Sequence, residues 1–469
     1  MGSSRPRERR FAALLGAAVL IAVAGATFAA SPISVQASGL SVRIVGNHFV
    51  DGTGRTVRLL GVNRSGSEYA CMANWAVFDG PSDAASIAAM ASWKINAVRE
   101  PLNEDCWLGI NGAPPALSGA GYHDAIAGYV SRLHAAGMVA IVDLHWNAQG
   151  SLPADGKTGQ GRKMADLDHA PSFWTSVATF FTNDPGVVFD LFNEPHDIDW
   201  DCWLHGCAIS DGTGTWQAAG MQTLLDAVRS TGATNVVTAS SNGWGGDIAQ
   251  WRNYKPKDPL GQIAPGWHVY YPETYYSAPS LWDTAVAPIA QELPIVTTEF
   301  GQHDCAGGWM NQFLPWADQH GLSYTAWTWD TWPDCSNPVL ITNYDGTPTG
   351  YGASLRDHLR SLNGINLASR PNAAQATTIK QSTHAAATPP AVVVTRAPVI
   401  SHHRVDPPPT IAVATRAVVR PPAPLSLIVL ILVVFVAEPM VLAAGLWWFR
   451  RRKRRNATAV EALPERVSA

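Results

Sequence analysis

Eight short apolar segments recur along the chain and alternate with longer segments of helical pattern, and this alternation restricts the possible folds most strongly. The apolar segments are five to eight residues long and rich in Val, Ile, Leu and aromatic residues, as is typical of strands buried on both faces. Segments between them, such as 122–137 and 216–232, have apolar residues at helical spacing and end at glycine. The eight predicted strands are residues 56–63, 96–102, 138–145, 187–193, 235–241, 267–271, 294–300 and 322–329.

Strands that alternate with helices predict an α/β fold with a parallel sheet, and eight such units fit a (β/α)8 (TIM) barrel. A doubly wound open sheet is the alternative, although the sequence contains no match to a glycine-rich nucleotide fingerprint. Residues 41–61 carry the Asp-Gly and Gly turn signals of a hairpin. We therefore expect a barrel that is preceded by an N-terminal β-hairpin.

The two ends of the sequence predict export and membrane anchoring. Residues 1–37 combine a basic start with a long apolar stretch and indicate a signal peptide, with an uncleaved anchor helix as the alternative. Residues 365–424, rich in Pro, Ala and Thr, are expected to form a disordered linker. Residues 425–449 are apolar and long enough to be a transmembrane helix, and the basic tail 450–469 is expected in the cytoplasm. The folded domain is then residues 39–364, held at the cell surface and facing outward.

Cysteine usage agrees with export. The chain has six cysteines, an even number, without a CxxC pair or the spacing of a zinc site. Six cysteines allow fifteen disulfide pairings. Closeness in sequence favours Cys202 with Cys207 and Cys305 with Cys335, which leaves Cys71 with Cys106.

Charge and aromatic content limit the possible partners. The formal net charge is -4, so the chain offers no basic surface and nucleic acid is not expected as a partner. Of the 19 tryptophans, all except Trp447 and Trp448 lie between Trp75 and Trp332. Large aromatic faces are thus concentrated in the predicted barrel, where they can stack on the apolar faces of sugar rings.

Most of the apolar segments end in polar or aromatic groups. In a parallel barrel the C-terminal ends of all strands meet at one rim, where barrel enzymes keep their active sites. Residues distant in sequence are therefore expected to line one pocket. They are Asn63, Arg99, His145, Asn193, Glu194, His268, Tyr270, Glu299 and Trp327.

Two of these residues are carboxylates, Glu194 at the end of the fourth segment and Glu299 at the end of the seventh. Either glutamate alone could be a solvated loop residue. As a pair facing each other across a tryptophan-rich cleft, they suit glycoside hydrolysis, in which one carboxylic acid protonates the leaving oxygen while the other attacks or activates water. The matching positions favour the catalytic interpretation.

The motifs FDLFNEPH, VDLHW, HVYYP and TTEFG, in this order and spacing, resemble those of glycoside hydrolase family 5, the cellulase-like barrels with catalytic glutamates on strands four and seven. The resemblance covers roughly residues 39–364. It implies that Glu194 is the general acid/base and Glu299 the nucleophile of a retaining, double-displacement mechanism.

The same resemblance implies roles for the other rim residues. Asn193 would bind the sugar 2-hydroxyl, Arg99 would hold the nucleophile ionised, and Tyr270 would donate a hydrogen bond to it. His145 and His268 match pocket histidines. Trp327 matches the aromatic floor of the sugar subsite at the cleaved bond, with Trp329 as the alternative if the last strand is shifted, because period-two alternation puts both on one face.

For some charged residues near the rim, a structural or solvent-exposed position is favoured over a functional role. Glu100, Asn103, Glu104 and Asp105 could belong to a sugar subsite or a calcium-like loop, but solvated loop residues are the favoured interpretation. Asp143 and Asp190, which precede the rim on their strands, are expected to make structural hydrogen bonds.

The expected function is hydrolysis of a β-linked polysaccharide, with β-1,4-glucan first and mannan or another hemicellulose as the alternative. A non-catalytic, surface-anchored carbohydrate-binding barrel is the competing class, but both glutamates and Asn193 are present. A serine hydrolase would need a G-x-S-x-G elbow and a zinc protease an H-E-x-x-H motif, and the sequence has neither. No cofactor or metal is expected, the partners are polysaccharide and membrane, and the protein is expected to be a monomer.

Overall fold

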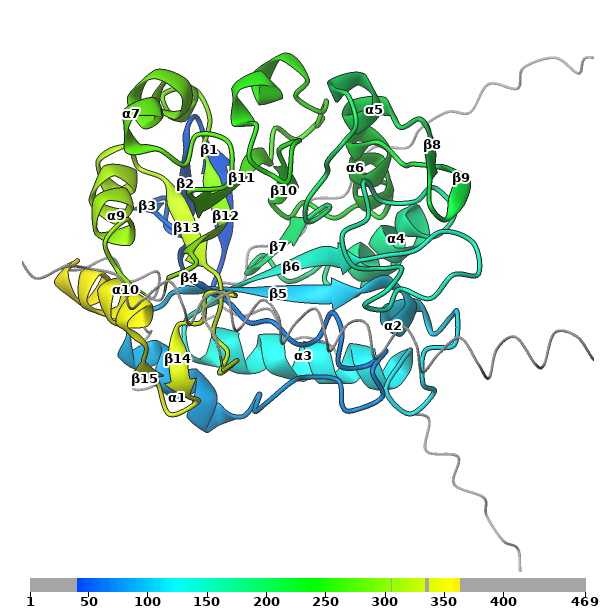
Figure 1. Cartoon of the computed structure of the whole chain (residues 1–469), viewed down its shortest axis with the longest axis horizontal. Coiled ribbons are helices and arrows are strands. Elements are labelled where there is room, and N and C mark those ends of the chain that lie inside the picture. Colours follow the sequence, from blue (N-terminus) through cyan, green and yellow to red (C-terminus); the bar gives the residue numbers. More distant parts are fainter. Residues whose placement is uncertain (1–39, 305, 334–336, 363–469) are drawn as a thin grey trace, which may run out of the picture. The chain divides into compact units, whose positions relative to one another are not determined.

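The computed structural model describes residues 40–304, 306–333 and 337–362. Within them, eight parallel strands close into a barrel, in the order expected for consecutive β/α units (Figure 1). The barrel strands are β4 (Leu60–Asn63), β5 (Ala97–Asn103), β6 (Val139–Trp146), β7 (Val187–Asp190), β10 (Val237–Ser240), β11 (Ile263–Tyr271), β12 (Val296–Gln302) and β13 (Ser323–Ala326). The predicted barrel is therefore confirmed, and the doubly wound sheet is excluded.

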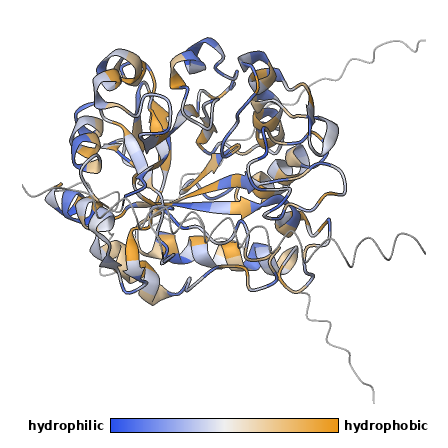
Figure 2. Ribbon diagram, in the orientation of Figure 1, coloured by the Kyte–Doolittle hydropathy of each residue, from blue (hydrophilic) through white to orange (hydrophobic). Residues whose placement is uncertain are grey.

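The main helices around the barrel each bury one apolar face. In α6 (Met221–Ser230) the buried residues are Met221, Leu224, Leu225 and Val228, which lie three and four positions apart as on one side of a helix. Along α3 (Ala120–Ala135) hydrophobic and hydrophilic residues likewise alternate within the turns (Figure 2). The other main helices are α1 (Ala84–Ser92), α3 (Ala120–Ala135), α4 (Ala170–Phe180), α9 (Met310–Gln319) and α10 (Gly350–Ser361).

Shorter elements occupy the loops between these units. They are α2 (Glu104–Leu108), α5 (Trp200–His205), the hairpin β8 (Ala208–Asp211) and β9 (Gly214–Gln217), the 3-10 helix η1 (Ile248–Asn253), α7 (Pro279–Leu281), the π-helix η2 (Trp282–Val286), α8 (Ala287–Ala290), and the pair β14 (Ile341–Asn343) and β15 (Thr347–Pro348).

The N-terminal hairpin is extended by one strand. β1 (Val42–Val45), β2 (His48–Asp51) and β3 (Thr56–Val57) form an antiparallel sheet. The first predicted strand, 56–63, was thus too long at its start, because Thr56 and Val57 pair with Val50 and Phe49 instead of entering the barrel. Apolar side chains of this sheet pack with the beginnings of the barrel strands in one core cluster, which closes the barrel opposite the rim.

The predicted signal peptide (1–37), linker (365–424), transmembrane helix (425–449) and tail (450–469) lie outside the described residues. Inside the described ranges, no helix has both the length and the apolar character needed to cross a bilayer. The described residues fall within the predicted domain of 39–364.

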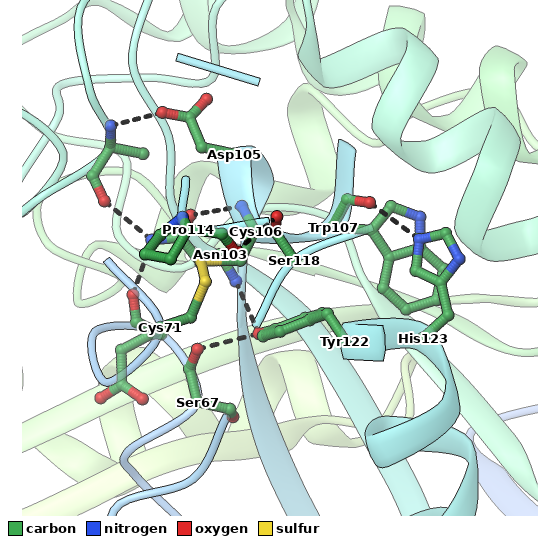
Figure 3. The surroundings of a disulfide bond; sticks show 12 residues. Ser67, Cys71, Asn103, Asp105, Cys106, Trp107, Pro114, Ser118, Tyr122 and His123 are labelled. Carbon is green, nitrogen blue, oxygen red and sulfur yellow. Dashed lines mark hydrogen bonds between the residues drawn. A yellow bond between two sulfur atoms is a disulfide. The ribbon is translucent and has the colours of Figure 1, made fainter. Parts of the chain in front are cut away.

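Two of the three expected disulfides are present, Cys71–Cys106 and Cys202–Cys207. The third predicted pair, Cys305 with Cys335, lies outside the described residues. Cys71–Cys106 joins the loop after β4 to helix α2, which Asn103 caps by accepting a hydrogen bond from the Cys106 backbone N–H (Figure 3). The loops after β4 and β5 are therefore linked covalently.

Removal of the Cys71–Cys106 bridge is expected to cost more stability than removal of Cys202–Cys207. The bridges span sequence separations of 35 and 5 residues, and the chain-entropy model then gives about 4 and about 2 kcal/mol respectively. Denaturant unfolding of the two double Cys→Ala variants measures the difference. Equal losses would contradict the entropic account.

Candidate active site

Arg99 on β5 organises the interior of the rim. Its side chain is fully buried and is surrounded by carboxylate and amide groups from other barrel strands. The guanidinium donates hydrogen bonds of 2.7 to 2.9 Å to the carboxylates of Asp143, Asp190 and Glu299 and to the amide oxygens of Asn63 and Asn193. Asp143 and Asp190 thus have the structural role predicted for them.

The charges in this group depend on one another. Desolvation lowers the pKa of Arg99, but the carboxylates of Asp143, Asp190 and Glu299 outweigh this effect and raise it above its usual value. Desolvation also raises the pKa of Asp143 to about 7, against the attraction of Arg99. One fixed cation therefore compensates several buried carboxyl groups, a set that is costly to disturb.

The two predicted catalytic glutamates face each other. One oxygen of Glu194 and one of Glu299 lie within 4.8 Å of each other, and both lie within that distance of a His268 ring nitrogen. Glu299 lies in β12 with 5% of its side chain exposed, whereas Glu194 follows β7 with 24% exposed. This upper limit on the distance between the nearest oxygens is compatible with the carboxyl separation of roughly 5 to 5.5 Å in retaining glycosidases, whereas inverting enzymes need about 6.5 to 9.5 Å.

Each glutamate has its own hydrogen-bond partners. Tyr270 donates to Glu299 Oε2 at 2.6 Å, while Arg99 donates to Oε1. Glu194 Oε1 shares a 3.0 Å hydrogen bond with Nδ1 of His268. Glu299 is therefore surrounded by donors that stabilise a carboxylate, and no arginine or lysine in the described part of the chain forms an ion pair with Glu194.

These surroundings shift the pKa values of Glu194, His145 and His268. Desolvation raises the pKa of Glu194 to about 7, against the attraction of His145 and Arg99. Desolvation lowers the pKa values of His145 and His268 to about 4, so both rings are neutral at pH 7. Glu194 can thus keep its proton near neutral pH, as a general acid requires, while two hydrogen-bond donors are directed at the oxygens of Glu299.

Aromatic residues line the rim beside the glutamates. Trp327 stacks on the His145 ring with centroids 5.5 Å apart, and His145 also contacts the Asp143 carboxylate through Nδ1 at 3.0 Å. Trp329 is fully buried edge-on against Trp93, with centroids 4.8 Å apart. Trp327, rather than Trp329, is therefore the tryptophan of this strand end that is available to a ligand.

Trp244 was not foreseen from the sequence. It is 43% exposed, and its ring stacks on His196 at 3.5 Å. Its backbone N–H donates to the Pro195 carbonyl, which places it beside the segment that carries Glu194. A tryptophan in the glycine-rich sequence NGWGG, just after the fifth apolar segment, was the available signal.

The favoured interpretation of Glu100, Asn103, Glu104 and Asp105 as solvated loop residues was wrong, because all four are fully buried. Glu100 accepts a hydrogen bond from Ser67, and burial raises its pKa to about 8. Asp105 accepts from the Ala154 backbone N–H (Figure 3). The loops that follow β4 and β6 cover these side chains, which sequence alone does not reveal.

The profile of Cellulase (glycosyl hydrolase family 5) matches residues 50–332. Endoglucanase 1 of Saitozyma flava is 31% identical over 30% of this chain and 36% of its own length. Endoglucanase MaCel5A of a Microbulbifer species is 23% identical over 45% of this chain and 38% of its own length. The chain thus spans well under half the length of these two curated relatives.

Solved structures show the same fold at low identity. A beta-glucanase from Saccharophagus degradans has a TM-score of 0.52 and 20% identity, covering 70% of this chain and 94% of its own. An endocellulase from the archaeon Pyrococcus horikoshii has a TM-score of 0.53 and 16% identity, covering 69% and 100%. Because the family profile covers more than half of the sequence, this chain belongs to glycosyl hydrolase family 5.

Proposed function

We propose that this protein is a retaining glycoside hydrolase that cleaves internal bonds of a β-1,4-linked glucan. The observation that carries the proposal is the pairing of Glu194 and Glu299, with oxygens within 4.8 Å and with different electrostatic surroundings. Family membership and the relatives named as endoglucanases support the substrate class.

In the proposed first step, the Glu299 carboxylate attacks the anomeric carbon while Glu194 donates its proton to the glycosidic oxygen. This forms a glycosyl-enzyme ester and releases the leaving sugar. Arg99 and Tyr270 orient Glu299 through their hydrogen bonds to its two oxygens. In the second step Glu194, now a carboxylate, removes a proton from the water that cleaves the ester.

The remaining rim residues position the sugar in this proposal. Asn193, 8% exposed and held by Arg99, binds the 2-hydroxyl. Trp327 forms the floor beneath the sugar ring, and His145 fixes the Trp327 ring by stacking. His268 remains neutral at pH 7 and holds the Glu194 carboxyl.

The dependence of kcat/KM on pH should reflect the titration of Glu194. Since its pKa is raised to about 7 and the acid must be protonated to act, kcat/KM should decrease as pH rises through about 7, approaching tenfold per pH unit. The Glu194→Gln variant should lose this alkaline limb while remaining able to form the ester from an aryl glycoside whose leaving group needs no proton. A wild-type kcat/KM that stays constant to about pH 9 would contradict the assignment.

A substrate panel tests the glycan. Purified protein should release oligosaccharides from β-1,4-glucans such as carboxymethyl cellulose, with a rapid decrease in viscosity as expected for internal cleavage. Preferential hydrolysis of mannan or xylan would assign a hemicellulase instead. Binding to glucan without any product would support the competing class, a non-catalytic carbohydrate-binding barrel.

We also propose that the catalytic domain acts outside the cell and is held at the cell surface by residues 425–449. The two disulfides support export, because such bonds persist in oxidising compartments. Cleavage of the domain from intact cells by added protease tests this location. Recovery of the activity in the cytoplasmic fraction would contradict it.

A further inference from the structure

A second cluster of ionisable side chains lies away from the proposed catalytic pair. Glu104 begins α2 just after β5, while Asp166 and His169 lie in the segment between β6 and α4. One oxygen of each carboxyl group and one ring nitrogen of His169 lie within 4.8 Å of one another. Glu104 and Asp166 are fully buried, whereas His169 keeps 23% of its side chain exposed.

The two carboxyl groups have too few partners for their burial. Asp166 accepts hydrogen bonds from the His169 backbone N–H at 2.8 Å and from Asn147 Nδ2 at 2.9 Å. Glu104 Oε1 lies 3.4 Å from the Ala148 backbone N–H and 3.8 Å from His169 Nδ1, and its Oε2 has no hydrogen-bond partner among the donors of the described residues. The Glu104 and Asp166 carboxyl groups also lie within hydrogen-bonding reach of each other, a contact that needs a shared proton or a bound cation. Within the described ranges, neither carboxylate forms an ion pair with a lysine or arginine.

A neutral oxygen at the same place is also unsatisfied. Asn147 is fully buried, and its amide group contacts the cluster because its nitrogen donates to Asp166. Its Oδ1 has no hydrogen-bond partner. The carboxyl groups of Asp105 and Asp168 lie near enough to act on Glu104 and Asp166, so four acidic side chains gather at this place. Burial of such a group needs a compensating positive charge or a bound proton.

We propose that Glu104, Asp166 and His169 bind a structural divalent cation of the Zn²⁺ type, and that the Asn147 amide turns its unpartnered Oδ1 toward the ion as an additional ligand. His169 Nδ1 is 3.8 Å from Glu104 Oε1 and 3.6 Å from Asp166 Oδ1. Ligand atoms about 2.0 to 2.2 Å from a tetrahedral zinc ion are separated by roughly 3.4 Å. Small shifts would thus complete the site, and an imidazole ligand favours zinc over calcium.

The cation would have a mechanical role. It would join the start of α2, the chain just after β6 and the segment before α4. Since β6 ends with His145 and Trp146, the bound ion would fix the loop that continues from one edge of the sugar-binding rim. The partial exposure of His169 provides the route by which the ion enters.

Metal analysis and thermal unfolding of the purified full-length chain test this proposal. After EDTA treatment and addition of Zn²⁺, we expect about one equivalent bound per chain and a higher Tm. The variants Glu104→Gln and His169→Ala should weaken Zn²⁺ binding by at least about 100-fold, since even the loss of an outer-shell partner costs 10- to 100-fold. The matched control is Glu292→Gln, an exposed carboxylate, which should bind Zn²⁺ like the wild type.

Two further variants and conditions show whether the Zn²⁺ ion binds at Glu104 or elsewhere. Glu194, His268 and Glu299 could also attract a metal ion, so Glu194→Gln should retain the high-affinity Zn²⁺ if the ion binds at Glu104. In EDTA, Glu104→Gln should be at least as stable as the wild type, because a buried glutamine needs neither a bound proton nor a cation, and Zn²⁺ should reverse this order. Absence of bound Zn²⁺ in the wild type, unchanged affinity in Glu104→Gln or His169→Ala, or a preference for Ca²⁺ would overturn the proposal.

Discussion

Replacing Glu299 with glutamine is expected to reduce kcat by roughly 10⁴-fold or more while leaving the fold intact. Glutamine keeps the shape of the side chain, and its single amide oxygen can still accept the hydrogen bond from Arg99 while its NH2 group can donate to the Tyr270 hydroxyl. It cannot form the glycosyl ester, because a neutral amide is a poor nucleophile. Initial rates on a cello-oligosaccharide, with circular dichroism to verify folding, measure the effect.

The control for this variant is Glu292→Gln, which changes a 57% exposed glutamate paired with Arg252. Its kcat should equal that of the wild type. Near-normal turnover by Glu299→Gln would exclude Glu299 as the nucleophile, since residual contamination cannot supply such a rate. A complete loss of folded protein would instead assign Glu299 a structural role.

Replacing Arg99 with methionine is expected to destabilise the protein by at least about 3 to 5 kcal/mol, because removal of one member of a buried ion pair leaves the other charges uncompensated. Three carboxylates lose their common partner in this variant: Asp143, Asp190 and Glu299. The amide oxygens of Asn63 and Asn193 lose a donor as well. The free energy of unfolding, measured with denaturant at pH 7, gives the size of the loss.

The variant Arg99→Lys separates the effect of the positive charge from the effect of the guanidinium geometry. Lysine keeps the positive charge but lacks the planar guanidinium that reaches five acceptors at once. We expect it to recover part of the stability and little of the activity, since Glu299 and Asn193 would no longer be held together. Wild-type stability in Arg99→Met would contradict the view that this cation compensates the buried carboxyl groups.

The barrel and the rim residues were predictable because they depend on local pattern. A strand buried on both faces reads as an apolar run, and the run must become polar where it reaches solvent. The segment 187–193 illustrates this: β7 ends at Asp190, but Leu191 and Asn193 still donate backbone hydrogen bonds to neighbouring segments at Thr238 and Leu144. The chain is thereby carried to Glu194 at the rim.

Loop residues were less predictable because other segments decide their environment. Glu104 and Asp105 look like solvated acids, yet segments far along the chain bury them, as the contacts with Ala148 and Ala154 show. The choice between Trp327 and Trp329 also depended on tertiary packing, because only Trp329 packs against Trp93. Period-two alternation alone puts both on the same face.

The stereochemistry of the first product tests the central claim most directly, namely that Glu299 attacks the sugar and Glu194 supplies the proton. Proton NMR during the first minutes of cello-oligosaccharide hydrolysis resolves the two anomers before they interconvert. A double displacement at oxygens within 4.8 Å predicts that the β-anomer forms first. Initial formation of the α-anomer would mean a single displacement by water and would contradict the assignment of Glu299 as nucleophile.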